Sequence, residues 1–175
     1  MELIFSIAET TDAPALVALQ DRVNEYLSLR FPGSPWKANA TERGMLFGMK
    51  HAKVLLARHG SEIAGMLRLQ TKKPWAIDIA YFTPVKKAVY LVGMAVGPAF
   101  QGKGVGSALL TEAVRLTRTW PADAIRLDAY DRPGGAGGFY ARNGFAHRGR
   151  ALYRNNPLLY FEMIVAPLPN RKADE

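Results

Sequence analysis

A glycine-rich loop near the middle of the chain has the residues of a phosphate-binding site. The segment 101–106, with the sequence QGKGVG, follows an apolar run and precedes an amphipathic helical pattern. The first amides of a helix lack hydrogen-bond partners within the helix and lie at the positive end of its dipole. Because glycine has no side chain, a ligand can approach the backbone closely. The loop therefore predicts a pyrophosphate cradle, although the same glycines would also suit a tight turn between strand and helix.

Two other phosphate-binding motifs fit this loop less well. Gly97, Gly102 and Lys103 have the spacing of a P-loop, but Gly104 occupies the position of the hydroxyl residue that binds magnesium. A dinucleotide site needs Gly-x-Gly-x-x-Gly near the first strand, whereas here the third glycine comes one residue early and the loop lies past the middle of the chain. A nucleoside triphosphate site with magnesium therefore remains a competing hypothesis, and a dinucleotide site is disfavoured.

The positions of apolar and turn residues predict the elements that carry this loop. Asp12 is expected to cap the first helix, and Pro14 to stand in its first turn. A near-continuous apolar run over 88–96 predicts a strand covered on both faces. The predicted order is a strand over 3–7, a helix after Asp12, a helix over about 39–50, strands over 53–58, 63–70 and 88–96, a helix over about 104–119, a strand over 125–130, a short helix near 135–143, and strands over 145–150 and 158–165. This order predicts a mixed α/β sandwich.

The composition is that of an ordinary globular protein with a basic surface. The chain has 175 residues, 49% of them hydrophobic, and a formal net charge of +8. It contains no cysteine, which excludes disulfides, thiolate metal sites and a cysteine nucleophile. The three histidines, His51, His59 and His147, show no ligand spacing, so no metal is expected. The basic residues are scattered rather than gathered, which suits either a solvated surface or a phosphate-bearing ligand.

The length and the sequence of the termini predict one domain without a membrane segment. We expect a domain over residues 1–168 and a polar tail over 169–175. The first residues contain no positively charged leader, and no stretch approaches the roughly 20 apolar residues that a membrane span needs. We therefore expect a cytoplasmic protein with no membrane partner. Nucleic acid is not expected as a partner, because no helix-turn-helix or RNP-type aromatic pattern accompanies the positive charge.

Two separated motifs resemble the GNAT superfamily, the acyl-CoA-dependent N-acyltransferases. Gln101, Gly104 and Gly106 match its Gln/Arg-x-x-Gly-x-Gly/Ala signature, and the segment 136–145 is similar to its A-x-x-[F/L]-Y-x-x-x-G-F element. The order of the expected elements over residues 3–165 also follows the GNAT plan. The resemblance implies a GNAT-like single domain of mixed α/β class, with a central, mixed but mostly antiparallel sheet of about seven strands flanked by four helices.

The resemblance implies an N-acetyltransferase that uses acetyl-CoA as its co-substrate. Backbone groups at the end of the strand over 88–96 would pair with the pantetheine arm, and amides of the glycine loop would hold the pyrophosphate. Arg142 would lie near the nucleotide end of the cofactor. The cofactor-binding residues implied in this way are Met94, Ala95, Val96, Gln101, Gly102, Lys103, Gly104, Val105, Gly106, Ser107 and Arg142.

The resemblance also implies a catalytic residue and a direct reaction. Tyr140 occupies the general-acid position of the family, although by spacing alone it would be a core aromatic residue. The amine would attack the thioester without an acyl-enzyme, which agrees with the missing cysteine, and an amide of Ala95 or Val96 would stabilise the oxyanion. One position departs from the family: Pro133 stands where members often have an asparagine that bonds the pantetheine, and Asp131 is a possible substitute for that contact.

The general base and the acceptor are less well defined by the sequence. Candidates for the base are Glu62, Asp78, Tyr90 and Asp128, and nothing in the sequence distinguishes among them. By resemblance, the acceptor pocket is built from the first two helices with their linker, the loop over 75–82 and the turn over 153–156. The acceptor-binding residues expected there are Tyr26, Phe31, Trp36, Tyr81 and Tyr153. The acceptor is expected to be an amine of a small molecule or peptide, and a homodimer is expected. The alternative is a GNAT-like module that senses acyl-CoA without turnover.

Overall fold

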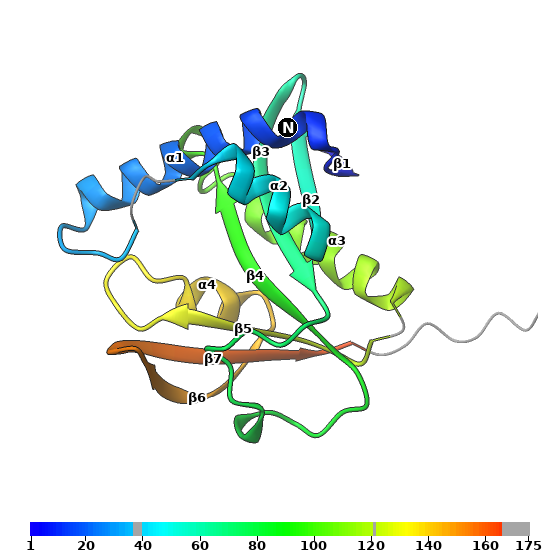
Figure 1. Ribbon diagram of the computed structural model, residues 1–175, viewed down its shortest axis with the longest axis vertical. Coiled ribbons are helices and arrows are strands. Elements are labelled where there is room, and N and C mark those ends of the chain that lie inside the picture. The colour runs from blue at the N-terminus through cyan, green and yellow to red at the C-terminus, as the bar shows by residue number, and fades with distance from the viewer. Residues whose placement is uncertain (37–39, 121, 166–175) are drawn as a thin grey trace, which may run out of the picture.

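The protein, seen in a computed structural model that describes residues 1–36, 40–120 and 122–165, is built on a seven-stranded sheet (Figure 1). The strands lie in the order β1-β2-β3-β4-β5-β7-β6, and every neighbouring pair is antiparallel except β4 and β5. The elements are β1 (Ile4–Ile7), α1 (Ala13–Arg30), α2 (Glu42–His51), β2 (Lys53–His59), β3 (Glu62–Gln70), β4 (Ala88–Val96), α3 (Val105–Thr119), β5 (Ala124–Tyr130), α4 (Gly137–Arg142), β6 (Ala146–Tyr153) and β7 (Asn156–Ile164).

The predicted fold class and element order are confirmed, with boundaries that differ by a few residues at most. The expected start of the second helix at residue 39 and the expected tail over 169–175 lie outside the described residues, as does the end of the expected domain at 168.

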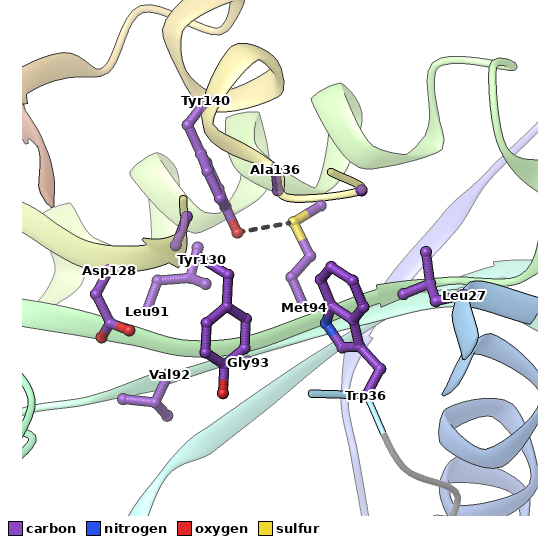
Figure 2. Close-up of a pocket in the computed structure, with 12 residues that line it drawn as sticks. Leu27, Trp36, Leu91, Val92, Gly93, Met94, Asp128, Tyr130, Ala136 and Tyr140 are labelled. Carbon is purple, nitrogen blue, oxygen red and sulfur yellow. Dashed lines mark hydrogen bonds between the residues drawn. The ribbon is translucent and has the colours of Figure 1, made fainter. Parts of the chain in front are cut away.

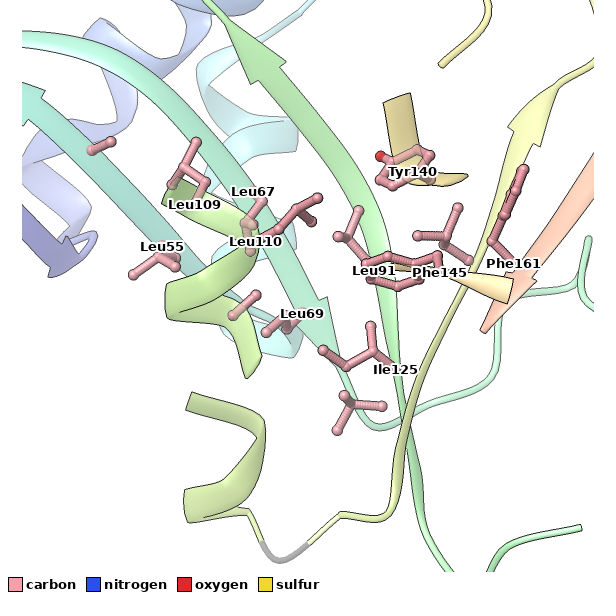
Figure 3. Packing of buried hydrophobic residues seen from close by; sticks show 14 of the residues in the cluster. Leu55, Leu67, Leu69, Leu91, Leu109, Leu110, Ile125, Tyr140, Phe145 and Phe161 are labelled. Atoms are coloured by element: carbon pink, nitrogen blue, oxygen red, sulfur yellow. The ribbon is translucent and has the colours of Figure 1, made fainter. Parts of the chain in front are cut away.

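The two faces of the sheet carry separate apolar clusters. On one face α3 packs Leu109 and Leu110 against Leu67 and Leu69 of β3, and the same cluster continues to Tyr140 of α4 (Figure 3). On the other face α1 packs Leu16, Leu19 and Val23 against β2 and β3, with Met45 of α2 in the same cluster. Both faces of β3 and β4 are therefore covered, which explains their near-continuous apolar sequences.

The parallel pair β4 and β5 separates along its length. Only three residue pairs join the two strands, from Ala88 and Ala124 to Tyr90 and Arg126. Beyond Tyr90, β4 stays paired with β3 and turns away from β5, as Figure 1 shows. A register shift opposite Arg68 and Leu69 leaves Val92 as an extra residue in β4, and such bulges bend a strand. The backbone of β4 after Tyr90 therefore faces a gap in the sheet.

Asp12 does not cap the first helix in the expected way. It stands at the position before Ala13, but its side chain makes no capping hydrogen bond. Its carboxylate instead accepts a hydrogen bond from the Glu9 amide, 2.9 Å away, and pairs with Arg58 of β2. The cause is local: Asp12 ends a 3-10 turn and has helical backbone angles, whereas a capping side chain needs an extended backbone.

A buried ion pair fixes the far side of β5. The Nε of Arg126 lies 2.9 Å from a carboxylate oxygen of Glu162 on β7, and its Nη2 donates to the Thr83 carbonyl at 2.6 Å. The other oxygen of Glu162 accepts from the Thr83 amide at 3.1 Å. Because both charges are paired and hydrogen-bonded, this network can exist inside the fold. It ties the long connection between β3 and β4 to the sheet.

Candidate functional site

A cavity of about 600 Å³ lies between the end of β4, the glycine loop and α4. It borders the end of β4, at residues 94–96, which is not paired with β5. Every predicted cofactor-binding residue lines this cavity except Lys103, including Arg142 at the end of α4. Apolar side chains from α1, Val23 and Leu27, complete the wall. The structure therefore brings together most of a set that extends over about fifty residues of sequence.

The glycine loop has the backbone geometry of an anion cradle. Gly102 and Gly104 have φ angles of +71° and +83°, in the left-handed region that favours glycine. Gly104 is the residue directly before α3, and its carbonyl accepts the first helical hydrogen bond from Ala108 at 3.0 Å. A Cβ added at either glycine would meet no atom within 4 Å. No neighbouring atom crowds these two positions at the start of α3, where helix amides can bind an anion.

Gln101 holds the loop against the end of β4. Its side-chain amide donates to the Val96 carbonyl at 3.1 Å. This bond joins the last residue of the strand to the first residue of the loop. It therefore helps to fix the position of the α3 amides relative to the backbone of β4. An extended chain that pairs with β4 would end at those amides.

A second cavity, of about 330 Å³, adjoins the first (Figure 2). It is lined by β4 residues, by the end of β5, and by Leu27 and Trp36 from the region of α1. The residues that border both cavities are Leu27, Met94, Gly134, Ala136 and Tyr140. The two cavities therefore meet beside the side chains of Met94 and Tyr140.

Tyr140 is held at this junction by α4 and by the core. Its ring packs on Phe139, Phe145 and Phe161 with centroid distances of 5.3, 5.7 and 6.1 Å. Its hydroxyl points to the sulfur of Met94 at 3.9 Å, as the dashed line in Figure 2 marks. Burial, and then the negative charge of Asp128, raise the pKa of the Tyr140 hydroxyl above its ordinary value of 10.0. Tyr140 is therefore a protonated donor at the meeting point of the cavities.

Asp128 is distinguished from the other candidates for a base. It lines the second cavity from β5, and burial raises the pKa of its carboxyl above the ordinary value of 3.8. Among residues 1–36, 40–120 and 122–165, no side chain forms an ion pair with it. A partly desolvated carboxylate without a counter-ion among the described residues, near a buried tyrosine hydroxyl, is typical of a functional site.

The other three candidates for the base line neither cavity. Glu62 is exposed at the start of β3, and the Asp78 carboxylate accepts a hydrogen bond from the Ala80 amide at 3.0 Å. Tyr90 is buried in a cluster with Ile77 and Phe82. Of the four, the described structure places only Asp128 in the lining of a cavity.

The aromatic residues expected around the acceptor divide into two groups. Trp36 lines the second cavity and stands edge-on to Tyr130 at 5.9 Å, and Phe31 packs behind Trp36 at 6.4 Å. Phe31 itself lines neither cavity, and the other three expected residues do not either. Tyr26 accepts a hydrogen bond from Arg30, Tyr81 packs on Tyr160, and Tyr153 belongs to the apolar cluster on the same side as Tyr160.

Two further sequence hypotheses concern residues near the cofactor cavity. Asp131, suggested as a substitute for a missing asparagine contact, pairs with Arg150 at 3.3 Å and does not line either cavity. Tyr130 lines the second cavity and does not figure among the predicted residues. Tyr130 follows Asp128 by two residues on a predicted strand, so the two side chains lie on the same face of the sheet. This spacing could have identified Tyr130 from the sequence as a neighbour of Asp128 in the site.

Comparison with protein families identifies the class. The model of the acetyltransferase (GNAT) family matches residues 19–145, which include both cavities and the glycine loop. The chain therefore belongs to the acetyltransferase (GNAT) family. Membership confirms the expected acyltransferase with acetyl-CoA as co-substrate. No curated protein sequence matches the chain.

Solved structures show the same fold at low sequence identity. The ribosomal-protein-S18-alanine N-acetyltransferase of Escherichia coli is 16% identical with a TM-score of 0.70, covering 97% of this chain and 98% of that one. YncA of Salmonella typhimurium, in a structure with its cofactor acetyl-CoA, is 14% identical with a TM-score of 0.66, covering 99% of each chain. The PaiA N-acetyltransferase of Thermoplasma acidophilum, in complex with coenzyme A, is 14% identical with a TM-score of 0.66, covering 91% of this chain and 98% of that one.

Neither a metal cluster nor a membrane-spanning helix is found among the described residues. Over 1–36, 40–120 and 122–165, no group of three or more histidine, aspartate or glutamate residues is placed to hold a metal ion. In the same part of the chain, no helix has the length and apolar character needed to cross a membrane.

Proposed function

We propose that the protein transfers the acetyl group of acetyl-CoA directly to a primary amine, with Tyr140 as general acid and Asp128 as general base. The observation that carries this proposal is the meeting of two cavities at Tyr140. The first cavity takes the donor, because it contains the anion cradle and the unpaired edge of β4. The second takes the acceptor amine, because Asp128 and the aromatic residues Trp36 and Tyr130 line it.

In the donor cavity the residues fit the parts of acetyl-CoA. The amides at the start of α3 suit the pyrophosphate, since they carry the positive end of a helix dipole. The edge of β4 from Met94 to Val96 suits the amides of the pantetheine arm, as an added strand would. Arg142 and Ser107 offer further donors along the same wall. Acetyl-CoA supplies the acetyl thioester, which this arrangement directs toward Tyr140.

The reaction needs two proton transfers. Asp128 takes a proton from the acceptor ammonium, directly or through one water, so that the nitrogen has a free electron pair. The nitrogen forms a bond to the acetyl carbon, and the bond from that carbon to sulfur breaks. Tyr140 gives its proton to the departing sulfur. The acylated nitrogen then carries two protons; one passes to Tyr140 and restores its hydroxyl, and the other stays on the amide. The balance is one N-acetyl product, free CoA and one proton released through Asp128.

The test of this proposal combines a titration with an acceptor screen. We expect calorimetric titration of the protein with acetyl-CoA to show saturable binding near one per chain, and ATP with magnesium to show none. Release of free thiol should then depend on an added amine. Binding of acetyl-CoA without transfer to any amine would favour the sensing module, and binding of ATP with magnesium in place of acetyl-CoA would contradict the donor site.

Replacing Gly104 with alanine tests the cradle. The φ angle of +83° would strain alanine by about 1–2 kcal/mol, while its Cβ would meet no neighbour. If the backbone relaxes to relieve this strain, the amides at the start of α3 no longer point toward the pyrophosphate. The Kd for acetyl-CoA should then rise about 10-fold. Calorimetry of wild type and variant measures this rise.

Gly60 provides a matched control for that variant. It lies in the turn between β2 and β3 and has a φ of +59°, and a Cβ added there would likewise meet no atom within 4 Å. Gly60→Ala should therefore lose a similar amount of unfolding free energy and keep the Kd of the wild type. If both variants bind acetyl-CoA equally well, the loop does not hold the pyrophosphate.

A further inference from the structure

Arg68, in the middle of β3, is a mostly buried cation for which the described residues supply no counter-ion. Its Nε is buried and makes no hydrogen bond in the part of the chain that the structure describes, and no described ion pair includes it. Burial lowers the pKa of Arg68 below its ordinary value of 12.5, yet a guanidinium remains charged in proteins. A desolvated charge is costly unless it is paired. The position of Arg68 therefore calls for an anionic partner.

Two glycines make room for the guanidinium. A Cβ added at Gly93 of β4 would lie 2.8 Å from its Nη2 and 2.9 Å from its Nε. A Cβ added at Gly48 of α2 would lie 3.2 Å from its Nη1. The guanidinium therefore lies between α2 and β4, at contacts that a larger side chain at either position would disturb.

Gly93 connects Arg68 to the acceptor cavity. Four β4 residues line that cavity, and of these only Gly93 has no side chain. The guanidinium lies against Gly93, so no side chain from that residue separates the positive charge from the cavity. On the opposite side, Asp128 of β5 contributes a carboxylate to the lining. Asp128 therefore lines the cavity, and the guanidinium of Arg68 lies directly behind Gly93 of the same lining.

We propose that Arg68 binds a carboxylate of the acceptor, so that the acceptor is an amine of the amino-acid class. This inference rests on the proposed role of the cavity as the acceptor site. An ammonium group beside Asp128 and a carboxylate beside Arg68 satisfy both charges at once. A polyamine would leave Arg68 unpaired and add a like charge near it. The guanidinium forms two parallel hydrogen bonds with a carboxylate, which makes arginine the suited residue.

The experiment compares acceptors that differ only in the carboxylate. A panel of amino acids is assayed for acetyl transfer beside the corresponding amino-acid amides, with wild type, Arg68→Gln and Arg68→Lys. For the preferred acceptor, kcat/KM of the wild type should be about 10- to 100-fold higher for the carboxylate form, the size of a charge-assisted contact. Arg68→Gln should lose this preference mainly through KM and use the amide as the wild type does. Arg68→Lys should keep part of the preference.

A binding measurement separates this inference from the proposed function. CoA-saturated protein is titrated with N-acetyl amino acids and with their amides, so that no turnover is needed. Arg115→Gln is the matched control, because Arg115 is an exposed residue of α3 whose side chain pairs with Glu112. If Arg68→Gln abolishes carboxylate-dependent binding and Arg115→Gln does not, the inference is supported. This holds even if no acetyl transfer is detected, although the lack of transfer would overturn the proposed function. If the wild type binds and acetylates the amino acids and their amides equally well, the role of Arg68 is overturned, while the proposed acetyl transfer still stands.

Discussion

Replacing Asp128 with asparagine is expected to lower kcat for amine acetylation about 100- to 10,000-fold at neutral pH, the range that a general base contributes. An amine that enters as an ammonium ion has no free electron pair, so it cannot attack the thioester until a proton leaves. Among the described residues that line the proposed acceptor cavity, Asp128 is the one carboxylate. Asparagine has almost the same shape and cannot accept that proton. Initial rates of thiol release at saturating acetyl-CoA measure the effect.

The pH dependence gives the same residue a second test. Burial raises the pKa of the Asp128 carboxyl above its ordinary value of 3.8. The active form of the base is the unprotonated carboxylate, so kcat/KM of the wild type should rise with pH through this raised pKa. In Asp128→Asn that rise should be absent, and the remaining slope should follow the acceptor amine alone. Profiles of kcat/KM from acidic to alkaline pH make the comparison.

Stability distinguishes a catalytic Asp128 from a structural one. A carboxyl group whose pKa is higher in the folded state costs stability at pH values above that pKa, and the cost disappears below the unfolded value. Asp128→Asn should therefore keep or increase the free energy of unfolding at neutral pH, measured with urea. Glu62→Gln, the same chemical change at an exposed site, should leave both kcat and stability unchanged. A variant of Asp128 that unfolds more easily, or that keeps the kcat of the wild type, would contradict the assignment.

The elements could be predicted from the sequence because their signals are local. The apolar run over 88–96 is enough to predict its strand, and the periodic pattern after the glycine loop is enough to predict the helix over 105–119. Asp12 shows where local reasoning failed. Its type and position favour a cap, but the 3-10 turn before it and the charge of Arg58, distant in sequence, determine where its carboxylate goes.

The site could be predicted in part, for a related physical reason. The donor residues belong to one continuous stretch from strand to helix, so a motif reveals most of them. The choice of Asp128 among four candidates depends on the separation of β4 from β5, which no local pattern encodes. Arg68 gave a visible signal, a lone charge in the apolar sequence IAGMLRLQ, but its unpaired state depends on α2 and β4 together. Pairing across the sheet, rather than residue type, determines where these side chains lie.

Replacing Tyr140 with phenylalanine is expected to lower kcat about 100- to 10,000-fold, the range of a general acid, while leaving the Kd for acetyl-CoA almost unchanged. The hydroxyl of Tyr140 contacts the Met94 sulfur at 3.9 Å, a weak interaction, whereas the ring packs on Phe145 and Phe161. Phenylalanine keeps the ring packing and removes the proton that the departing sulfur needs. Single-turnover acetyl transfer and calorimetric titration with acetyl-CoA measure the two quantities separately.

Tyr90→Phe is the matched control for this variant. Tyr90 and Tyr140 each expose 6% of their surface, and Tyr90 lines neither cavity, so its loss of a hydroxyl should leave kcat unchanged. Because the pKa of Tyr140 is raised above its ordinary value of 10.0, the hydroxyl stays protonated at neutral pH. The wild type should therefore lose no activity through Tyr140 as the pH rises to mildly alkaline values. If Tyr140→Phe keeps the kcat of the wild type, solvent protonates the sulfur, and Tyr140 contributes only to packing in the apolar core.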